Sequence, residues 1–374
     1  RNYVTKLRRK NKKRYTKDIL YTCKNDSKKL WRELNKITAR KRKDDSLPCD
    51  LTGNKLNEFF VSVGNVKIDN IEDMIWKNPE CIHEFMFDSI KECDVNDALK
   101  KLGSESNVDI LNCDSKLLCI AAPVIIESLT LLFEESLKLG IIPIEWKISK
   151  VTPIYKGKGD KNNPSNYRPI SVTSHVVKIL ERIIQRQLLK YLRNNDLISI
   201  DQSAFLPNHS TNTCIHRAVD DWLESFNENE MVAACFLDIS KCFDSINHEL
   251  LLQKLQYYGI KGNALKWFTS YLNDRSQLVY CHGTSSKPEH ILHGVPQGSV
   301  LGPILFLLFI NDLSQSVQLC SCNMFADDVV VYYADKDIDN LVKHFQADLN
   351  RIFKWYEQNR LRLYVDKTKV MLLS

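Results

Sequence analysis

The sequence lacks three features that mark other classes of protein. Its longest uninterrupted apolar run, Val300 to Ile310, has 11 residues, whereas a membrane-spanning helix needs about 20. The first residues are charged rather than apolar, unlike a secretory signal peptide. The 12 cysteines include no C-x-x-C pair, which is the usual half of a structural zinc site. We therefore expect a reduced, intracellular protein with no membrane contact.

One zinc site can nevertheless be drawn from the cysteines and histidines. Cys281-His282 is followed by His290 and His293, and these are side-chain types that bind zinc. The alternative is a hairpin leading into the glycine-proline motif that starts at Gly294. We favour the hairpin.

The charge of the chain is distributed unevenly. The net charge is +6, but residues 1–43 hold 18 Lys and Arg against 3 Asp and Glu, which leaves the remainder at −9. A segment this basic is typical of contact with nucleic acid through the phosphate backbone. The alternative is a solvated, partly disordered tail. Leu20, Leu30 and Leu34 indicate that helical stretches form within it.

A few segments have clear secondary-structure patterns. Residues 44–48 are predicted to be a linker, and 56–60 a helical stretch. Residues 123–139 fit an amphipathic helix with Pro123 in its first turn and Gly140 at its end. Residues 151–155 are predicted to form a strand. Residues 176–192 have apolar spacings of three and four, which predict a packing helix.

The most informative stretch is Phe325-Ala326-Asp327-Asp328. It lies between Cys322-Asn323-Met324 and the apolar run 329–333, so it is predicted to be the turn of a hairpin that presents two adjacent carboxylates. Such a pair repels itself unless a cation is bound, and Mg²⁺ prefers carboxylate and phosphate oxygens. The alternative is an ordinary surface turn.

Asp238 supplies a third carboxylate at the end of another predicted strand, Ala234 to Asp238. Three aspartates on neighbouring strands could hold two metal ions roughly 3.5–4 Å apart. That arrangement supports in-line phosphoryl displacement. The carboxylates alone therefore predict a two-metal site for phosphoryl displacement.

The wider context resembles the reverse transcriptases of LINE-type (non-LTR) retrotransposons. Phe325 to Asp328 is similar to the FADD variant of their signature. The other similar segments occur in the order found in the family: a fingers segment with Lys150 to Lys156 and Asn166 to Ser171, a first palm motif at 236–250, a second at 294–303, and a fourth with Leu361-Arg362-Leu363 and Lys367-Thr368. The resemblance covers about residues 132–374.

The resemblance implies an α+β fold with the fingers and palm of a right-hand polymerase, and an antiparallel palm sheet flanked by helices. It divides the chain into a basic arm and linker (1–47), an N-terminal extension (48–131), fingers (132–230) and palm (231–374). The thumb and the endonuclease of the parent protein are expected to be missing, because the sequence stops at Ser374. We therefore expect the chain alone to be weakly processive or inactive.

The resemblance also assigns the catalytic residues. Asp238 and Asp327 are the expected bridging metal ligands and Asp328 an auxiliary ligand, with two Mg²⁺ ions that Mn²⁺ can replace. Lys367 is the candidate general acid for pyrophosphate. Tyr364 stands where the family usually has Asn, which is a departure close to Lys367.

The incoming dNTP has its own set of expected contacts. Lys156 and Arg168 would reach the phosphates from two strands of a fingers hairpin. Phe243 would stack beneath the sugar and exclude a ribose 2′-OH, and Gln297 with Gly298 would touch the sugar or the template base. Asp244 is interpreted as structural.

The expected partners are an RNA template, a DNA primer or target, and dNTPs, with the arm 1–43 on nucleic acid. Nuclear and cytoplasmic ribonucleoprotein locations both stay open. Alternatives are a non-catalytic nucleic-acid-binding remnant and a polymerase like a group II intron maturase. An RNA-dependent RNA polymerase is disfavoured by Phe243 and the Pro296-Gln297-Gly298 turn.

Overall fold

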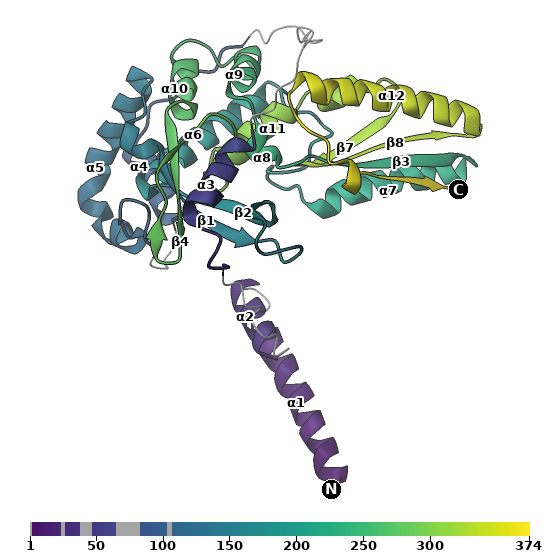
Figure 1. Ribbon diagram of the computed structural model, residues 1–374, viewed down its shortest axis with the longest axis horizontal. Coiled ribbons are helices and arrows are strands. Elements are labelled where there is room, and N and C mark those ends of the chain that lie inside the picture. Colours follow the sequence, from purple (N-terminus) through teal and green to yellow (C-terminus); the bar gives the residue numbers. More distant parts are fainter. Residues whose placement is uncertain (1, 24–26, 38–46, 65–82, 103–106) are drawn as a thin grey trace. The chain divides into compact units, whose positions relative to one another are not determined.

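The computed structural model describes residues 2–23, 27–37, 47–64, 83–102 and 107–374. The chain divides into two compact units, Arg1–Leu47 and Pro48–Ser374. The first unit contains the helices α1 (Asn2–Thr22) and α2 (Ser27–Ile37), so the helical stretches expected in the basic segment are present (Figure 1). The side chains of Tyr15, Tyr21 and Trp31 are 61–71% exposed there. Most of the predicted linker lies outside the described residues.

The second unit mixes helices with two sheets, as an α+β fold does (Figure 1). Its longer helices are α3 (Gly53–Ser62), α4 (Glu92–Lys100), α5 (Ser115–Leu139), α6 (His175–Asn194), α7 (Thr211–Asn227), α9 (His248–Tyr257), α10 (Gly262–Leu272), α11 (Gly302–Ile310) and α12 (Ile338–Gln358). Single turns occur at α8 (Cys242–Ser245) and at the 3₁₀ segments η1 (Ile144–Lys147), η2 (Pro164–Asn166), η3 (Leu313–Ser316) and η4 (Val365–Lys367). Helices α3 and α6 confirm the helices predicted at 56–60 and 176–192.

The first sheet is built on the hairpin of β1 (Ile148–Tyr155) and β2 (Tyr167–Val172), which pair antiparallel. Strand β1 also pairs in parallel with β4 (Arg275–Cys281). Strand β4 in turn pairs with the short strands β5 (Thr284–Ser285) and β6 (Glu289–Ile291). The strand predicted at 151–155 is therefore the second half of β1.

The second sheet is antiparallel throughout, in the order β7-β8-β3-β9. Its strands are β7 (Ser321–Phe325), β8 (Asp328–Asp335), β3 (Met231–Asp238) and β9 (Lys369–Leu373). Alternate residues of β3 face opposite sides: Cys235 joins the main core, whereas Ala234 packs in a smaller cluster with Ala218 of α7. Helices α12 and α7 therefore cover the two faces (Figure 1).

The run Val300 to Ile310 becomes a core helix. All residues of α11 except Pro303 are buried, which explains why this helix is apolar all round. The helix begins at Gly302. The Ser299 hydroxyl accepts a hydrogen bond from the Gly302 N–H at 3.0 Å and donates to the Pro296 carbonyl at 2.9 Å. This places a turn, rather than helix, directly after Gln297.

Helix α5 also differs from the prediction. It starts at Ser115, because the Asp114 carboxylate accepts hydrogen bonds from the N–H groups of Lys116 and Leu117, and Pro123 lies inside the helix. It ends at Gly140 as predicted, with φ at 66°.

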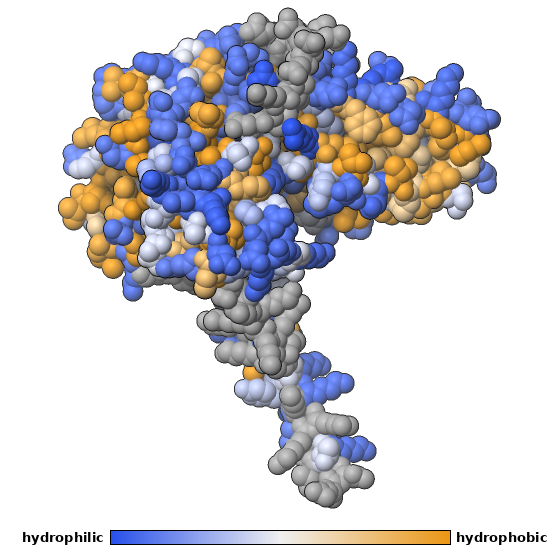
Figure 2. Space-filling model, in the orientation of Figure 1, coloured by the Kyte–Doolittle hydropathy of each residue, from blue (hydrophilic) through white to orange (hydrophobic). Residues whose placement is uncertain are grey.

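Helix α5 is long and apolar enough to cross a membrane by length and composition alone. Its residues Phe133, Ser136 and Leu137 are buried against the rest of the second unit, but only 11% of its most apolar stretch is buried. Its outer side exposes Leu117, Ile120, Val124 and Leu131 to solvent. In Figure 2 the region of α5 shows hydrophobic residues at the surface.

Candidate functional site

The predicted carboxylate hairpin is present between β7 and β8. Phe325 pairs with Asp328, which closes a two-residue turn of Ala326 and Asp327. Ala326 has φ at 56°, a left-handed conformation uncommon for a residue with a side chain. The turn therefore presents Asp327 at its tip and Asp328 at the start of β8.

Asp238 lies opposite this turn. It ends β3 and is the register partner of Asp328 across the antiparallel pair β3·β8. Residues placed in this way have Cβ atoms about 5 Å apart. Burial raises the pKa of Asp328, and the negative charges of Asp327 and Asp238 raise it further. The three carboxylates thus come from two chain segments and repel one another in one place.

Two further side chains hold the turn, and neither was foreseen. The Gln202 side-chain oxygen accepts hydrogen bonds from the N–H groups of Ala326 at 3.1 Å and Ala204 at 2.8 Å. The buried thiol of Cys242 hydrogen-bonds to Asp327, and burial together with that carboxylate raises its pKa. Both groups fix the position of Asp327.

Lys367 reaches the carboxylates from η4. Its Nζ atom lies 3.3 Å from Asp238 Oδ2. Tyr364 donates its backbone N–H to the Asp238 carbonyl at 2.8 Å, and its ring lies under the Lys367 ammonium, 4.5 Å from Nζ to the ring centre. The departure at Tyr364 therefore leaves Lys367 at the site.

Lys156 and Arg168 come together at the loop end of the β1–β2 hairpin. Arg168 pairs with Ile154 in the register, and Lys156 follows β1 directly. The Lys156 ammonium donates to the Ser165 carbonyl at 2.8 Å. Burial lowers its pKa, and the nearby charges of Arg168 and Lys367 lower it further, whereas Asp244 and Asp238 act in the opposite sense. The cations of the hairpin thus face the carboxylates of the second sheet.

Gln297 is held from both sides. Its side-chain amide donates to Asp244 Oδ1 at 2.8 Å, and its carbonyl accepts from the Ser171 N–H at 2.7 Å. Gly298 has φ at 129°, and a Cβ atom at this position would clash with the Ser171 carbonyl. Asp244 therefore orients Gln297, which agrees with its interpretation as a structural residue. Burial raises the pKa of Asp244 to about 6.

The ring of Phe243 is fixed in place. It stacks on Phe306 of α11 with ring centres 4.6 Å apart and meets Phe205 edge-on at 6.3 Å. It is partly exposed rather than fully buried. A ring held like this on one side can act as a rigid wall on the other.

The donor set suits a hard divalent ion. Carboxylate oxygens from Asp238, Asp327 and Asp328 are the ligands that Mg²⁺ prefers, and their mutual repulsion favours a bound cation. Across the described ranges no group of three or more His, Cys, Asp or Glu side chains is arranged close enough to hold a metal ion.

The zinc alternative is not supported. Cys281 pairs with Thr284 in the β4–β5 hairpin, as the favoured interpretation required. Cys281 and His290 belong to different strands, and the described part of the chain shows no cluster of metal-binding side chains.

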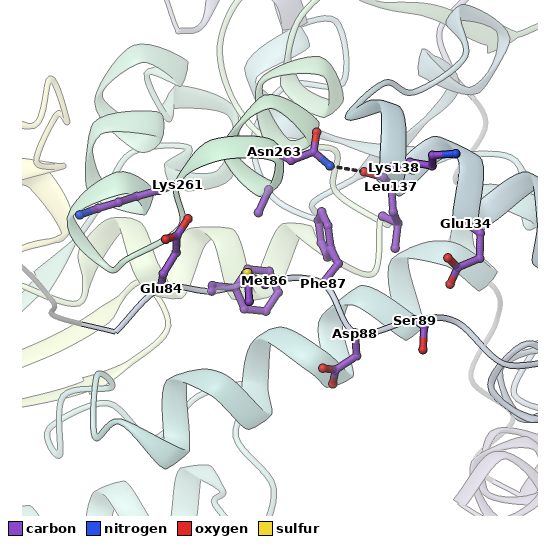
Figure 3. A pocket seen from close by; sticks show the side chains of 12 residues that line it. Glu84, Met86, Phe87, Asp88, Ser89, Glu134, Leu137, Lys138, Lys261 and Asn263 are labelled. Carbon is purple, nitrogen blue, oxygen red and sulfur yellow. Dashed lines mark hydrogen bonds between the residues drawn. The ribbon is translucent and has the colours of Figure 1, made fainter.

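A pocket of about 390 Å³ lies away from these residues. It is lined by the segment Glu84 to Ser89 and by the ends of α5 and α10. Figure 3 shows the Asn263 side chain on one side of it, hydrogen-bonded to the Leu137 carbonyl. The lining contains none of the predicted site residues.

Comparison with known families gives one match over most of the second unit. Residues 157–373 match the family model described as reverse transcriptase (RNA-dependent DNA polymerase). The matched range contains all the predicted site residues except Lys156, which immediately precedes it.

Two curated relatives come from Drosophila melanogaster. The probable RNA-directed DNA polymerase from transposon BS is 28% identical over 289 residues, which are 74% of this chain and 31% of the relative. The corresponding protein from transposon X-element is 31% identical over 237 residues, 61% of this chain and 25% of the relative. The chain therefore spans about a quarter to a third of the length of these relatives.

Among solved structures, apo telomerase from Candida tropicalis, truncated from its C-terminal domain, is similar with a TM-score of 0.45 and 14% identity. The alignment covers 62% of this chain and 51% of that one. This likeness is weak, and the α+β description rests on the elements themselves.

Proposed function

The chain belongs to the reverse transcriptase (RNA-dependent DNA polymerase) family, and on this premise we propose that it extends a DNA primer on an RNA template. The substrates are deoxynucleoside triphosphates. The chain is part of the polymerase of a LINE-type retrotransposon, similar to its relatives from transposons BS and X-element. Enzymes of the family generally use divalent metal ions; we propose two Mg²⁺ ions here, which Mn²⁺ can replace.

One observation carries this proposal: Asp238 and Asp328 face each other in register while Asp327 occupies the adjoining turn. Opposite them lie the cations of the β1–β2 hairpin. The charge of Arg168 lowers the pKa of Lys156, and the charge of Asp238 acts in the opposite sense. Bound metal ions would neutralise the carboxylates, and the phosphates of a nucleotide would neutralise the cations of the hairpin. A surface turn with two acids would need neither the third carboxylate nor the facing cations.

Asp238, Asp327 and Asp328 would hold the metal ions, which when bound acidify the primer 3′-OH and neutralise the leaving pyrophosphate. The residues of the chain orient the reactants. Arg168 is suited to grip phosphate oxygens through two parallel hydrogen bonds, because its guanidinium is a planar fork. Lys367 can donate a proton to the pyrophosphate, and Tyr364 holds its ammonium near Asp238.

We further propose that Phe243 selects the sugar. Its ring is backed by Phe306 and cannot retreat without disturbing α11. A ribose 2′-OH meeting this ring would be excluded sterically, and a deoxyribose would be accepted. Gln297, oriented by Asp244, would contact the sugar or the template base from the other side.

The basic first unit is proposed to grip nucleic acid. Residues 1–43 combine 18 basic residues with exposed aromatic rings at Tyr15, Tyr21 and Trp31. Lysine and arginine neutralise phosphates, and aromatic rings can stack on unpaired bases. Binding through this unit should weaken steeply as salt is raised.

Primer extension tests the function. The chain is mixed with poly(rA)/oligo(dT), dTTP and Mg²⁺, beside the variant Asp327→Asn. We expect the unchanged chain to add only a few dTMP residues, in keeping with its expected weak processivity, and the variant to add none, with equal binding of the duplex by both. Duplex binding without addition by either protein would favour the non-catalytic remnant instead.

A further inference from the structure

Helix α3 lies outside the residues that match the family, yet it contacts the candidate site. The side chain of Asn57 is fully buried and fixes the helix to β4: its amide donates to the Lys287 carbonyl at 2.8 Å and its oxygen accepts from the Gln277 amide at 3.0 Å. At the end of the helix, a Cβ atom at Gly64 would clash with His293, beside the Asp244 carbonyl. Helix α3 is therefore packed firmly at the edge of the first palm motif.

From this helix, Phe59 meets a lysine of the palm motif. The Lys241 Nζ atom lies 3.8 Å from the centre of the Phe59 ring, which is the geometry of a cation–π contact. Lys241 has φ at 49°, and lies between Asp238 and Phe243 in sequence. The aromatic ring thus holds the ammonium beside the catalytic strand.

Lys241 is partly buried, and no salt bridge to it is found within the part of the chain that the structure describes. Burial lowers its pKa to about 8. The carboxylate whose charge acts on it, Asp244, already accepts the Gln297 amide, and the described residues provide no salt bridge to Lys241. The charge of Lys156 also acts on Lys241, so the two ammonium groups are neighbours. A partly desolvated cation beside other cations is stabilised when an anion binds between them.

We propose that Lys241 binds the polyphosphate of the incoming nucleotide and that Phe59, on helix α3, is the positioning residue that holds its ammonium there. The ligand class is a linear polyphosphate, as found in a nucleoside triphosphate. This inference deepens the proposed function, on which the choice of nucleotide as ligand rests. Lys156 and Arg168 would contact the phosphates from the β1–β2 hairpin and Lys241 from the side of β3.

Binding of inorganic tripolyphosphate tests this without requiring catalysis. Isothermal titration calorimetry on the whole chain, in Mg²⁺ and without primer or template, gives the dissociation constant. We expect Lys241→Met to weaken binding by roughly tenfold to a hundredfold, as for the loss of a charged hydrogen bond, and Lys241→Arg to restore most of it. Phe59→Leu should weaken binding by roughly threefold to tenfold, and Phe59→Trp should keep it.

The double variant separates positioning from general packing. If Phe59 acts through Lys241, Phe59→Leu has no further effect in a chain that already carries Lys241→Met. The matched control is Tyr280→Leu, which removes the similar lysine–aromatic contact between Lys150 and Tyr280, 3.9 Å from Nζ to the ring centre, on the first sheet. It should leave tripolyphosphate binding unchanged.

Two results would overturn the inference. One is that Lys241→Met binds tripolyphosphate as tightly as the unchanged chain. The other is that Phe59→Leu weakens binding equally in the unchanged chain and in the Lys241→Met variant. Thermal melting identifies a variant that does not fold, and Phe59→Met then replaces Phe59→Leu. A chain that binds tripolyphosphate through Lys241 but adds no nucleotide would refute the proposed polymerase activity and leave this inference standing.

Discussion

The side-chain oxygen of Gln202 accepts a hydrogen bond from the backbone N–H of Ala326, although 124 residues separate them in sequence. Ala326 is the left-handed residue of the turn that presents Asp327. The segment around Gln202 adds to this contact, since the Ser203 N–H donates to the Met324 carbonyl at 2.9 Å. The turn that presents Asp327 is therefore held by a chain segment that is not part of its own hairpin.

Replacing Gln202 by Leu should damage both stability and activity. The change leaves the N–H groups of Ala326 and Ala204 without their acceptor, which costs about 1–3 kcal/mol of unfolding free energy for a buried donor. The turn then loses its fixed conformation, so nucleotide addition should fall further than stability alone explains. Urea denaturation and single-nucleotide addition measure the two effects.

The control for this variant is Gln346→Leu, because Gln346 is an exposed residue of α12 whose side-chain amide donates to the Asn350 side chain on the same helix. It should change neither property measurably. Wild-type addition by a folded Gln202→Leu variant would show that the turn needs no support from Gln202.

The buried ion pair of Lys254 and Asp312 should dominate the stability of the region between α9 and α11. The Lys254 ammonium is fully buried, donates to Asp312 Oδ1 and to the Phe309 carbonyl, both at 2.6 Å, and has its pKa lowered by burial. Asp312→Leu alone removes the carboxylate that accepts a hydrogen bond from the buried ammonium and should cost about 3–5 kcal/mol of unfolding free energy.

Changing both partners should cost much less. The double variant Lys254→Met with Asp312→Leu removes both charges, and we expect it to recover most of the lost unfolding free energy. Chemical denaturation of the two single variants and the double variant measures the coupling. If the loss of unfolding free energy in the double variant equals the sum of the losses in the two single variants, the ion pair is not the source of the stability.

The raised pKa of Asp244 predicts a pH dependence. Its folded-state pKa of about 6 lies above the ordinary value of 3.8, so the folded chain binds a proton more tightly than the unfolded chain. Stability contributed by this proton is present at low pH and is lost as the pH rises from about 4 to about 6.

Asp244→Asn removes the titrating group and keeps an oxygen for Gln297. The difference in unfolding free energy, variant minus parent, should therefore increase between pH 4 and pH 6 and then level off. Denaturation curves at several pH values measure it. Parallel curves for the two proteins would show that Asp244 titrates normally.

Shortening the side chain at Phe243 should relax sugar selection. Phe243→Val removes the wall that Phe306 supports, so a ribose 2′-OH no longer clashes. We expect the ratio of kcat/KM for dTTP over UTP to fall by roughly tenfold or more, the equivalent of about 1.4 kcal/mol of lost clash. Steady-state addition of each nucleotide measures the ratio.

A suitable comparison is Phe205→Leu, at the ring that touches Phe243 only edge-on at 6.3 Å. It should change the ratio little. An unchanged preference for dTTP in Phe243→Val would exclude the ring as the selector and favour its role as a core residue.

Local patterns in the sequence were sufficient to predict how Asp238, Asp327 and Asp328 are brought together. The β-forming residues on both sides of Asp327 and Asp328 predicted a hairpin, and the apolar run before Asp238 predicted a neighbouring strand. Arg168 could be placed because Pro169 restricts it to an extended conformation. Each of these features depends on residues within a few positions of one another.

Contacts between distant segments could not be predicted in this way. The pairing of Phe59 with Lys241 depends on how α3 packs on β4, and no periodicity encodes that. The start of α5 was misplaced because Pro123 suggested a first turn, whereas the Asp114 cap and tertiary packing carried the helix across it. Similarly, the hydroxyl of Ser299 extends the turn before α11 to Gly302.

The central claim is that Asp238 and Asp327 make nucleotide addition depend on metal ions. Its most direct test is single-turnover addition of dTMP to oligo(dT) on poly(rA) in Mg²⁺, comparing Asp327→Asn with Asp335→Asn. Asp335 stands at the opposite end of β8, so both variants remove one carboxylate charge from the same hairpin. We predict a loss of roughly a hundredfold or more for Asp327→Asn, because a lost metal ligand removes several kcal/mol of transition-state stabilisation, and a parental rate for Asp335→Asn. A parental rate for Asp327→Asn would contradict the claim, as would an equal loss in both.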